Sequence, residues 1–286
     1  MRAYRGGENG SNLGPIVKLG VAHFALSGVL ILGFHVPVRD IFRKILGVRF
    51  YISDLEGLVD LVPEGGLIVA PSAPVLVRLA DDPAHREALE GADLAITDSS
   101  FMVLLWLFRT GERIQRISGL RMLRAMFADG GFRGRGDTFW LMPSKADSDA
   151  NLEWLRSQGF QVSAEDALVA PMYPKSGPIA DPGLVGLING RRPKLVVIAL
   201  SGGVQERLGW ELRQRLDYKP AILCIGGAIA FLTGQQASIP VWADRLGLGW
   251  VIRFVAAPKR FSAKVEGVWR LAPMIWKFRS RSVAAK

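Results

Sequence analysis

The chain has 286 residues, 49% of them hydrophobic, so it can bury a sizeable core and is not generally disordered. A single cysteine, Cys224, excludes an internal disulfide framework, and three scattered histidines beside it argue against a zinc site. The net charge of +10 is concentrated at the two ends of the chain. Arg253–Lys286 holds nine Lys and Arg against one acid, and Met1–Arg49 holds seven against two. Basic ends around a slightly acidic body favour an anionic surface such as a membrane as partner, and disfavour nucleic acid.

Residues 1–44 are expected to form an N-terminal extension. Its apolar run, Ile16–Phe34, is nearly long enough to cross a bilayer, although His23 and three glycines weaken that interpretation. A membrane segment and an apolar helix packed on the body or lying in the membrane interface both stay open. The basic stretch that follows, Val38–Gly47, is predicted to be helical.

Residues 45–252 are expected to form the core. Short apolar runs alternate there with helical patterns, which is typical of a parallel α/β sheet. The predicted strands are Val48–Ser53, Leu67–Ala70, Ala92–Thr97, Thr138–Met142, Gln161–Ser163, Lys194–Leu200 and Ala221–Ile225. The predicted helices are 54–61, 75–80, 82–89, 101–108, 120–128, 147–157, 182–189, 204–216 and 228–233.

Asp98 directly follows the predicted strand Ala92–Thr97 and precedes the strongly apolar helix Phe101–Phe108. The carboxyl ends of parallel strands are where ligands bind in such sheets. A carboxylate at this position is either a helix N-cap or a general base, and local sequence alone favours the cap. Arg116, in the basic loop that follows, suits bidentate phosphate contact or an ordinary surface role.

Two strand–glycine–helix units lie close together in the sequence. Gly202 and Gly203 precede one predicted helix, and Gly226 and Gly227 precede the next. Glycines at such turns let a ligand approach the backbone, and a helix N-terminus favours phosphate. Neither unit matches a dinucleotide or P-loop motif, so plain tight turns are an equal alternative. Gln205 and Glu206, in the first turn of the first helix, would bond a nucleotide or merely complement the helix dipole.

The tail, Arg253–Lys286, interleaves cations with five large aromatic residues, and Pro258 and Pro273 are expected to divide it into two short helices. Aromatics beside Lys and Arg on short helices are typical of an interfacial segment. The alternative is a solvated basic C-terminus, which would expose an unusual amount of aromatic surface. We therefore expect a basic, aromatic-rich membrane-docking appendage.

Six stretches, taken in order, carry a resemblance to a known family: APSAP, GADLAITDSS, QRISG, ALSGGVQERLGW, CIGGAIAFLTG and RLGLGWVIRFVAAPKR. Over about residues 45–261 the chain resembles the WecG/TagA/CpsF glycosyltransferases. The resemblance implies a Rossmann-like parallel sheet with helices on both faces, and a C-terminal helical appendage. It implies a bacterial enzyme at the cytoplasmic face of the inner membrane. The apolar run Ile16–Phe34, which lies outside the resemblance, leaves open whether the enzyme is peripheral or anchored there.

The implied reaction moves a sugar from a UDP-sugar to a polyprenyl-diphosphate-linked glycan in cell-surface polysaccharide synthesis, with inversion and without metal or cofactor. The resemblance implies that Asp98 is the catalytic base and that Arg116 lies near the sugar or diphosphate. It implies a nucleotide-sugar site of Ser72, Gly202, Gly203, Gln205, Glu206, Gly226 and Gly227. It also implies diphosphate contacts from the appendage through Arg253, Lys259 and Arg260.

The chain departs from the family pattern at Ala70, Ser72, Ser99 and Ala230, where the pattern has Thr, Asn, Gly and Asp. These departures keep a rival hypothesis open, in which a catalytically inactive relative acts as a membrane-associated scaffold or lipid-carrier-binding protein. A homo-oligomer is compatible with either hypothesis.

Overall fold

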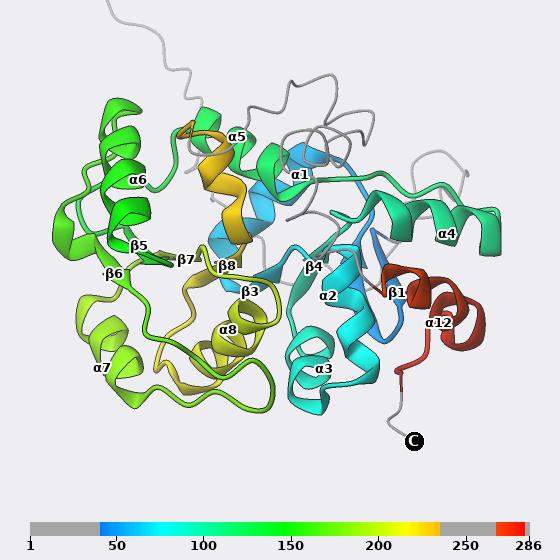
Figure 1. Cartoon of the computed structure of the whole chain (residues 1–286). Coiled ribbons are helices and arrows are strands. Elements are labelled where there is room, and N and C mark those ends of the chain that lie inside the picture. Colours follow the sequence, from blue (N-terminus) through cyan, green and yellow to red (C-terminus); the bar gives the residue numbers. More distant parts are fainter. Residues whose placement is uncertain (1–40, 235–266, 284–286) are drawn as a thin grey trace, which may run out of the picture. The chain divides into compact units, whose positions relative to one another are not determined.

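The computed structural model describes residues 41–234 and 267–283, which form an α/β unit on one eight-stranded sheet (Figure 1). Its strands are β1 Phe42–Ile45, β2 Val48–Tyr51, β3 Gly66–Val69, β4 Leu94–Ile96, β5 Thr138–Met142, β6 Ala167–Val169, β7 Leu195–Ile198 and β8 Ala221–Cys224. Their order across the sheet is β1-β2-β4-β3-β8-β7-β5-β6. The β1–β2 pair is antiparallel, and every other neighbouring pair is parallel. The predicted Rossmann-like α/β fold is confirmed.

Helices cover both faces of this sheet (Figure 1). One face carries α2 Ala73–Val77, α3 Pro83–Glu90, α4 Ser100–Thr110, α7 Pro182–Arg191, α8 Val204–Arg215 and α12 Leu271–Phe278. The other carries α1 Leu55–Leu61, α5 Gly119–Asp129 and α6 Lys145–Ser157. The 3₁₀ helices are η1 Val62–Glu64, η2 Arg78–Ala80, η3 Ala164–Asp166, η4 Gly226–Phe231 and η5 Val268–Arg270.

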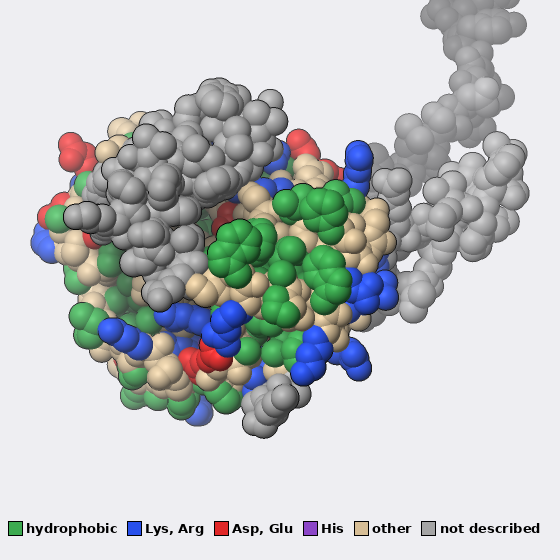
Figure 2. Space-filling view, turned by 45° about the vertical axis from the view of Figure 1, so that its right-hand side comes forward, with side chains coloured by type: hydrophobic (Ala, Val, Ile, Leu, Met, Phe, Trp, Pro, Cys, Tyr) green, Lys and Arg blue, Asp and Glu red, His purple; other side chains and the backbone are tan. Residues whose placement is uncertain are grey.

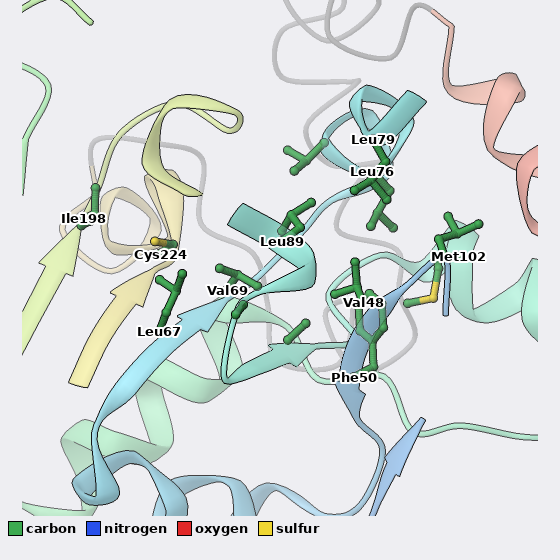
Figure 3. Close-up of a cluster of buried hydrophobic side chains, with 14 of the residues drawn as sticks. Val48, Phe50, Leu67, Val69, Leu76, Leu79, Leu89, Met102, Ile198 and Cys224 are labelled. Atoms are coloured by element: carbon green, nitrogen blue, oxygen red, sulfur yellow. The ribbon is translucent and has the colours of Figure 1, made fainter. Parts of the chain in front are cut away.

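The central strands are apolar at every position because both of their faces are covered. In β3, Leu67 and Val69 face one apolar cluster and Ile68 faces the other. Figure 3 shows the first cluster, to which Leu67 and Val69 of β3 contribute together with Leu76 of α2 and Leu89 of α3. This packing fixes the carboxyl ends of the strands in one row, which is where the candidate site lies.

Three local predictions were wrong. Val38–Gly47 was expected to be helical, but its described part forms β1 and a tight turn at Leu46 and Gly47, whose φ values of 53° and 85° suit a two-residue hairpin. Gln161–Ser163 is not a strand. The chain turns there through η3, where Asp166 caps the Ser163 amide at 2.7 Å, and the strand is β6.

The third error concerns Pro273, which was expected to end a helix and instead occupies the third position of α12. A proline is tolerated in the first turn because the amide there has no partner within the helix. Residues 16–34 and the first part of the tail, including Pro258, lie outside the described residues.

The described end of the tail, residues 267–283, packs on the core. Leu271, Met274 and Ile275 are buried in the same cluster as the strands. The Leu46 amide donates to the Arg279 carbonyl at 2.7 Å, so α12 is joined to the β1–β2 hairpin. One side of this segment is thus part of the folded core, while Trp269 and Trp276 remain exposed.

Candidate functional site

The residues predicted to bind substrate converge on four neighbouring strand ends. Asp98 follows β4, Ser72 follows β3, Gly226 follows β8 and Gly202 follows β7, and these strands are adjacent in the order β4-β3-β8-β7. The carboxyl edge of a parallel sheet is open to ligands because the strands end there and the loops diverge. The fold thus gathers residues that are up to 154 positions apart in sequence, since Ser72 and Gly226 follow the adjacent strands β3 and β8.

Asp98 is not the N-cap of the helix that follows it. Ser99 takes that role, since its side chain accepts from the Met102 amide at 3.1 Å. One carboxylate oxygen of Asp98 instead accepts from the Gly119 amide, the first of α5, at 3.2 Å. Helix α5 thus holds Asp98 at the end of β4, and the Asp98 side chain remains partly exposed.

Arg116 lies against Asp98. Its Nε donates to the Asp98 carbonyl at 3.0 Å. The loop that carries Arg116 is fixed to β4 by Thr97, whose hydroxyl donates to the Gln115 carbonyl at 2.6 Å and accepts from the Ile117 amide at 3.0 Å. A carboxylate and a guanidinium therefore stand side by side at one strand end, with backbone hydrogen bonds holding both.

The two glycine turns are clamped together by the first turn of α8. Gln205 Oε1 accepts from the Gly226 amide at 2.7 Å, and Gln205 Nε2 donates to Glu206 Oε1 at 3.0 Å. The other oxygen of Glu206 accepts from the Gly203 amide at 2.5 Å. Both side chains are buried. These two glycine amides already have acceptors within the protein, so they are not available to a ligand. What the turns offer a ligand is close approach to their backbone.

Both turns need glycine. Gly203 has φ of 92°, and a Cβ there would collide with the guanidinium of Arg78. A Cβ on Gly202 would collide with Val75 of α2. Gly226 has φ of 57°. Gly203 and Gly226 thus have the left-handed backbone that favours glycine, and Gly202 has no room for a side chain.

Arg207 and Arg78 are site residues that the sequence analysis missed. Arg207 is 2% exposed and donates to the Gly203 carbonyl at 2.6 Å and to the Pro174 carbonyl at 2.7 Å. Arg78 is exposed and donates to the Gly202 carbonyl at 3.3 Å. The signal for Arg207 was the unbroken polar run Gln205-Glu206-Arg207 in a buried helix start, whereas nothing in the sequence marked Arg78.

Two buried ionisable residues, Asp82 and His85, lie at the start of α3 and adjoin this arrangement. Asp82 lies 3.9 Å from Arg207 Nε, and its other oxygen caps α3 by accepting from the Ala84 amide at 3.1 Å. Burial lowers the pKa of His85, whose Nε2 donates to the Val75 carbonyl at 3.0 Å and whose Nδ1 is buried without a partner. His85 is therefore neutral at neutral pH and serves the packing between α3 and α8.

A family model described as the glycosyl transferase WecG/TagA/CpsF family matches residues 43–285 of the chain. The chain belongs to this family. It is therefore a glycosyltransferase of cell-surface polysaccharide synthesis, as the ordered motifs implied. The match includes the C-terminal segment that packs on the core.

The remaining positions of this glycosyltransferase are placed as follows. Ser72 is the N-cap residue of α2 and its side chain makes no capping hydrogen bond. Ala70 packs near Gly119, and Ala230 is buried in η4. Arg253, Lys259 and Arg260, predicted to contact diphosphate, lie outside the described residues.

Two further findings hold for residues 41–234 and 267–283. No helix there is long and apolar enough to cross a membrane. No group of three or more His, Cys, Asp or Glu side chains is gathered there in a way that could hold a metal ion.

Proposed function

We propose that this glycosyltransferase moves a sugar from a UDP-sugar to a hydroxyl of a polyprenyl-diphosphate-linked glycan. The observation that carries the proposal is the partly exposed Asp98 carboxylate at the end of β4, beside Arg116 and in the same row as Ser72 and the glycine turns. A carboxylate and a cation at a ligand-binding sheet edge supply a base and a charge partner for a leaving diphosphate.

The reaction is a single displacement with inversion. Asp98 takes the proton of the acceptor hydroxyl as its oxygen bonds to the anomeric carbon of the donor. The bond between that carbon and the diphosphate oxygen breaks, and its electron pair leaves with UDP. Arg116 faces the developing negative charge, which is the kind of preorganised electrostatic stabilisation that lowers such barriers most. No bound metal is required in this scheme, because arginine supplies the charge.

The nucleotide half of the donor is proposed to lie along the glycine turns. The backbone of the turns at Gly202, Gly203, Gly226 and Gly227 would line its path, while Gln205 and Glu206 hold the turns in shape. Arg78, exposed above Gly202, supplies a cation next to this path. The enzyme is proposed to act at the cytoplasmic face of the bacterial inner membrane, because activated nucleotide sugars are cytosolic and the proposed acceptor is lipid-linked.

The Asp98→Asn variant tests the base. An asparagine keeps the acceptor atom for the Gly119 amide but cannot take a proton, so the fold and UDP binding should persist while transfer is lost by at least about 100-fold. Transfer of radiolabelled sugar to a polyprenyl-diphosphate glycan, screened over UDP-sugars, measures the rate, and calorimetry measures UDP binding. Asp149→Asn, at an exposed surface carboxylate, is the matched control. Unchanged turnover in Asp98→Asn would remove Asp98 from the mechanism.

The rival hypothesis is a non-catalytic scaffold, and the departures at Ala70, Ser72, Ser99 and Ala230 motivate it. Ser99 caps α4 through its side chain, and Ala230 is buried in η4. Calorimetry of the wild-type protein with UDP separates the two hypotheses. Binding in the range typical of enzyme substrates, about 1 μM to 1 mM, supports the enzyme, and no heat at higher concentration supports the scaffold.

A further inference from the structure

Thr97 places a hydroxyl in the core, one residue before Asp98. Its side chain is fully buried, and all three residues of β4 before it are apolar. Valine has almost the same shape and would fit such surroundings, since burying a hydroxyl costs free energy unless the group is hydrogen bonded. What the hydroxyl does is therefore decided by its hydrogen bonds.

These hydrogen bonds bracket Arg116. The Thr97 hydroxyl donates to the Gln115 carbonyl at 2.6 Å and accepts from the Ile117 amide at 3.0 Å. These two groups belong to the two peptide units that flank the Cα atom of Arg116. Because peptide units are planar, their positions define φ and ψ of Arg116. One oxygen atom thus sets the direction in which the Arg116 side chain leaves the backbone.

The two ends of this loop have anchors of their own. Residues 111–118 join α4 to α5 and contain no helix or strand. Near the start of the loop, the Glu112 carboxylate accepts side-chain hydrogen bonds from β1 and from α4. At its end, the Ser118 side chain caps α5. The Thr97 hydroxyl holds the stretch between these anchors, and that stretch carries Arg116.

The loop passes from the surface into the core at Arg116. Gln115 is exposed, whereas Ile117 is fully buried. Helix α4, which leads into the loop, also lies at the surface, and Figure 2 shows hydrophobic side chains gathered on the face that carries α4 and α12. Within the described part of the chain, the middle of the loop is thus held from the core side, through Thr97.

The same set of bonds returns to Asp98. Arg116 Nε donates to the Asp98 carbonyl at 3.0 Å, and the Gly119 amide donates to an Asp98 carboxylate oxygen at 3.2 Å. Two adjacent residues at the end of the strand, Thr97 and Asp98, therefore hold both ends of the segment from Arg116 to Gly119. A shift of this segment would move the guanidinium and the donor to the carboxylate together.

We propose that Thr97 is a positioning residue, whose hydroxyl sets the place of the Arg116 side chain relative to the Asp98 carboxylate. Without the hydroxyl, the exposed Gln115 would turn its carbonyl to water, and the buried Ile117 amide would regain a partner only when the loop opens. A misplacement of about 1 Å at a reacting centre can cost about 100-fold in rate. This effect on turnover rests on the proposed function, whereas the hold on the loop does not.

Two substitutions at position 97 separate shape from hydrogen bonding. Thr97→Val keeps the shape and removes the hydroxyl, whereas Thr97→Ser keeps the hydroxyl. In the full-length protein, we expect Thr97→Val to lower kcat for sugar transfer at least about tenfold. The KM for the UDP-sugar should change by less than about twofold, because the nucleotide is proposed to bind at the glycine turns. Thr97→Ser should retain most of the wild-type kcat.

Thr138→Val is the matched control for stability. Thr138 is 2% exposed at the start of β5, at the sheet edge opposite the site, and its hydroxyl accepts from Trp140 Nε1 at 2.9 Å. Loss of either threonine hydroxyl leaves a buried polar group unpaired, so both valine variants should unfold at a lower temperature than the wild type. Only Thr97→Val should lower kcat.

A double variant tests the route of the effect. If Thr97 acts through Arg116, then Thr97→Val should cause no further loss of kcat in a protein that already carries Arg116→Ala. Losses that multiply would show that Thr97 affects the rate by another route, and would contradict its assignment as a positioning residue for Arg116.

Hydrogen–deuterium exchange measures the hold on the loop without catalysis. The amides of residues 113–119 should exchange at least about fivefold faster in Thr97→Val than in the wild type, because the loop opens more often. Thr97→Ser and Thr138→Val should leave the exchange of these amides near the wild-type rate.

Three results would overturn the proposal: unchanged exchange of residues 113–119 in Thr97→Val, a wild-type kcat in that variant, or equal losses of kcat in Thr97→Val and Thr138→Val. The last would assign the effect to stability alone. A wild-type protein that transfers no sugar, combined with the expected pattern of exchange, would contradict the proposed function and leave the hold of Thr97 on the loop standing.

Discussion

His85 has no proposed role in the reaction, but it affects the stability of the fold that holds the site. It belongs to α3 and is fully buried, with the charged groups of Glu206, Asp82 and Arg78 nearby. Because burial lowers its pKa, the folded protein resists protonation of a side chain that the unfolded chain protonates near pH 6.5. The unfolded state therefore binds more protons below that pH, and folding stability falls as the pH falls.

This predicts a loss of stability on mild acidification. The free energy of unfolding of the wild-type protein should fall from about pH 7.5 to about pH 5.5, and that of His85→Gln should fall less over the same window. Urea unfolding followed by circular dichroism at several pH values measures both. Equal slopes in the two proteins would show that His85 does not carry this pH dependence.

At the scale of the element, the first turn of α8 acts as a clamp. Gln205, Glu206 and Arg207 each bind a backbone group of a glycine turn, so this single helix fixes the ends of β7 and β8 together. Such a fully satisfied buried polar network holds one geometry, and loss of one member leaves a polar group unpaired.

We therefore expect Gln205→Leu to cost about 1–3 kcal/mol of stability, because the partly buried Gly226 amide loses its acceptor. UDP affinity should fall as well, since the two turns lose their mutual position. Gln214→Leu, at an exposed position on the same helix, should change stability by no more than about 0.5 kcal/mol. Thermal unfolding and UDP calorimetry on both variants check this, and equal behaviour of the two would contradict the clamp.

At the scale of the whole described unit, α12 closes the apolar core at the β1–β2 edge. Ile275 is fully buried, whereas its neighbour Trp276 is 47% exposed. We expect Ile275→Ala to cost about 2–5 kcal/mol, through lost burial and a cavity. Trp276→Ala should cost much less in stability, because that side chain is already partly exposed. Chemical denaturation of the two variants makes the comparison, and a small cost for Ile275→Ala would mean that α12 is not part of the core.

Much of the fold was predictable from sequence because its signals are local. Buried parallel strands read as continuous apolar runs, and the runs at Leu67–Ala70 and Ala221–Ile225 correspond to β3 and β8. β1 was missed because its four residues, FRKI, carry two cations and gain their strand conformation from pairing with β2. Edge strands often carry such charges, which discourage pairing with other chains.

The site was predictable to a lesser degree. The order of the motifs indicated Asp98, Arg116 and the glycine turns, and the topology places them on adjacent strand ends. Local sequence favoured Asp98 as the cap of α4, but Ser99 caps that helix, and Asp98 accepts from the Gly119 amide of α5, 21 residues later. Pairings of this kind, and the contact of Arg78 with Gly202, depend on tertiary structure and leave no periodic signal.

The hydrogen bond between Leu46 and Arg279 has a consequence for biosynthesis. It joins the first hairpin of the described unit to a helix near the opposite end of the sequence. Synthesis runs from the N-terminus at about 5–20 residues per second, and domains tend to fold as whole units. The apolar surface that Leu271 and Ile275 cover stays open on the nascent chain until the ribosome has released residues 267–283. The enzyme thus completes its core and its exposed aromatic face together, once residues 267–283 have left the ribosome.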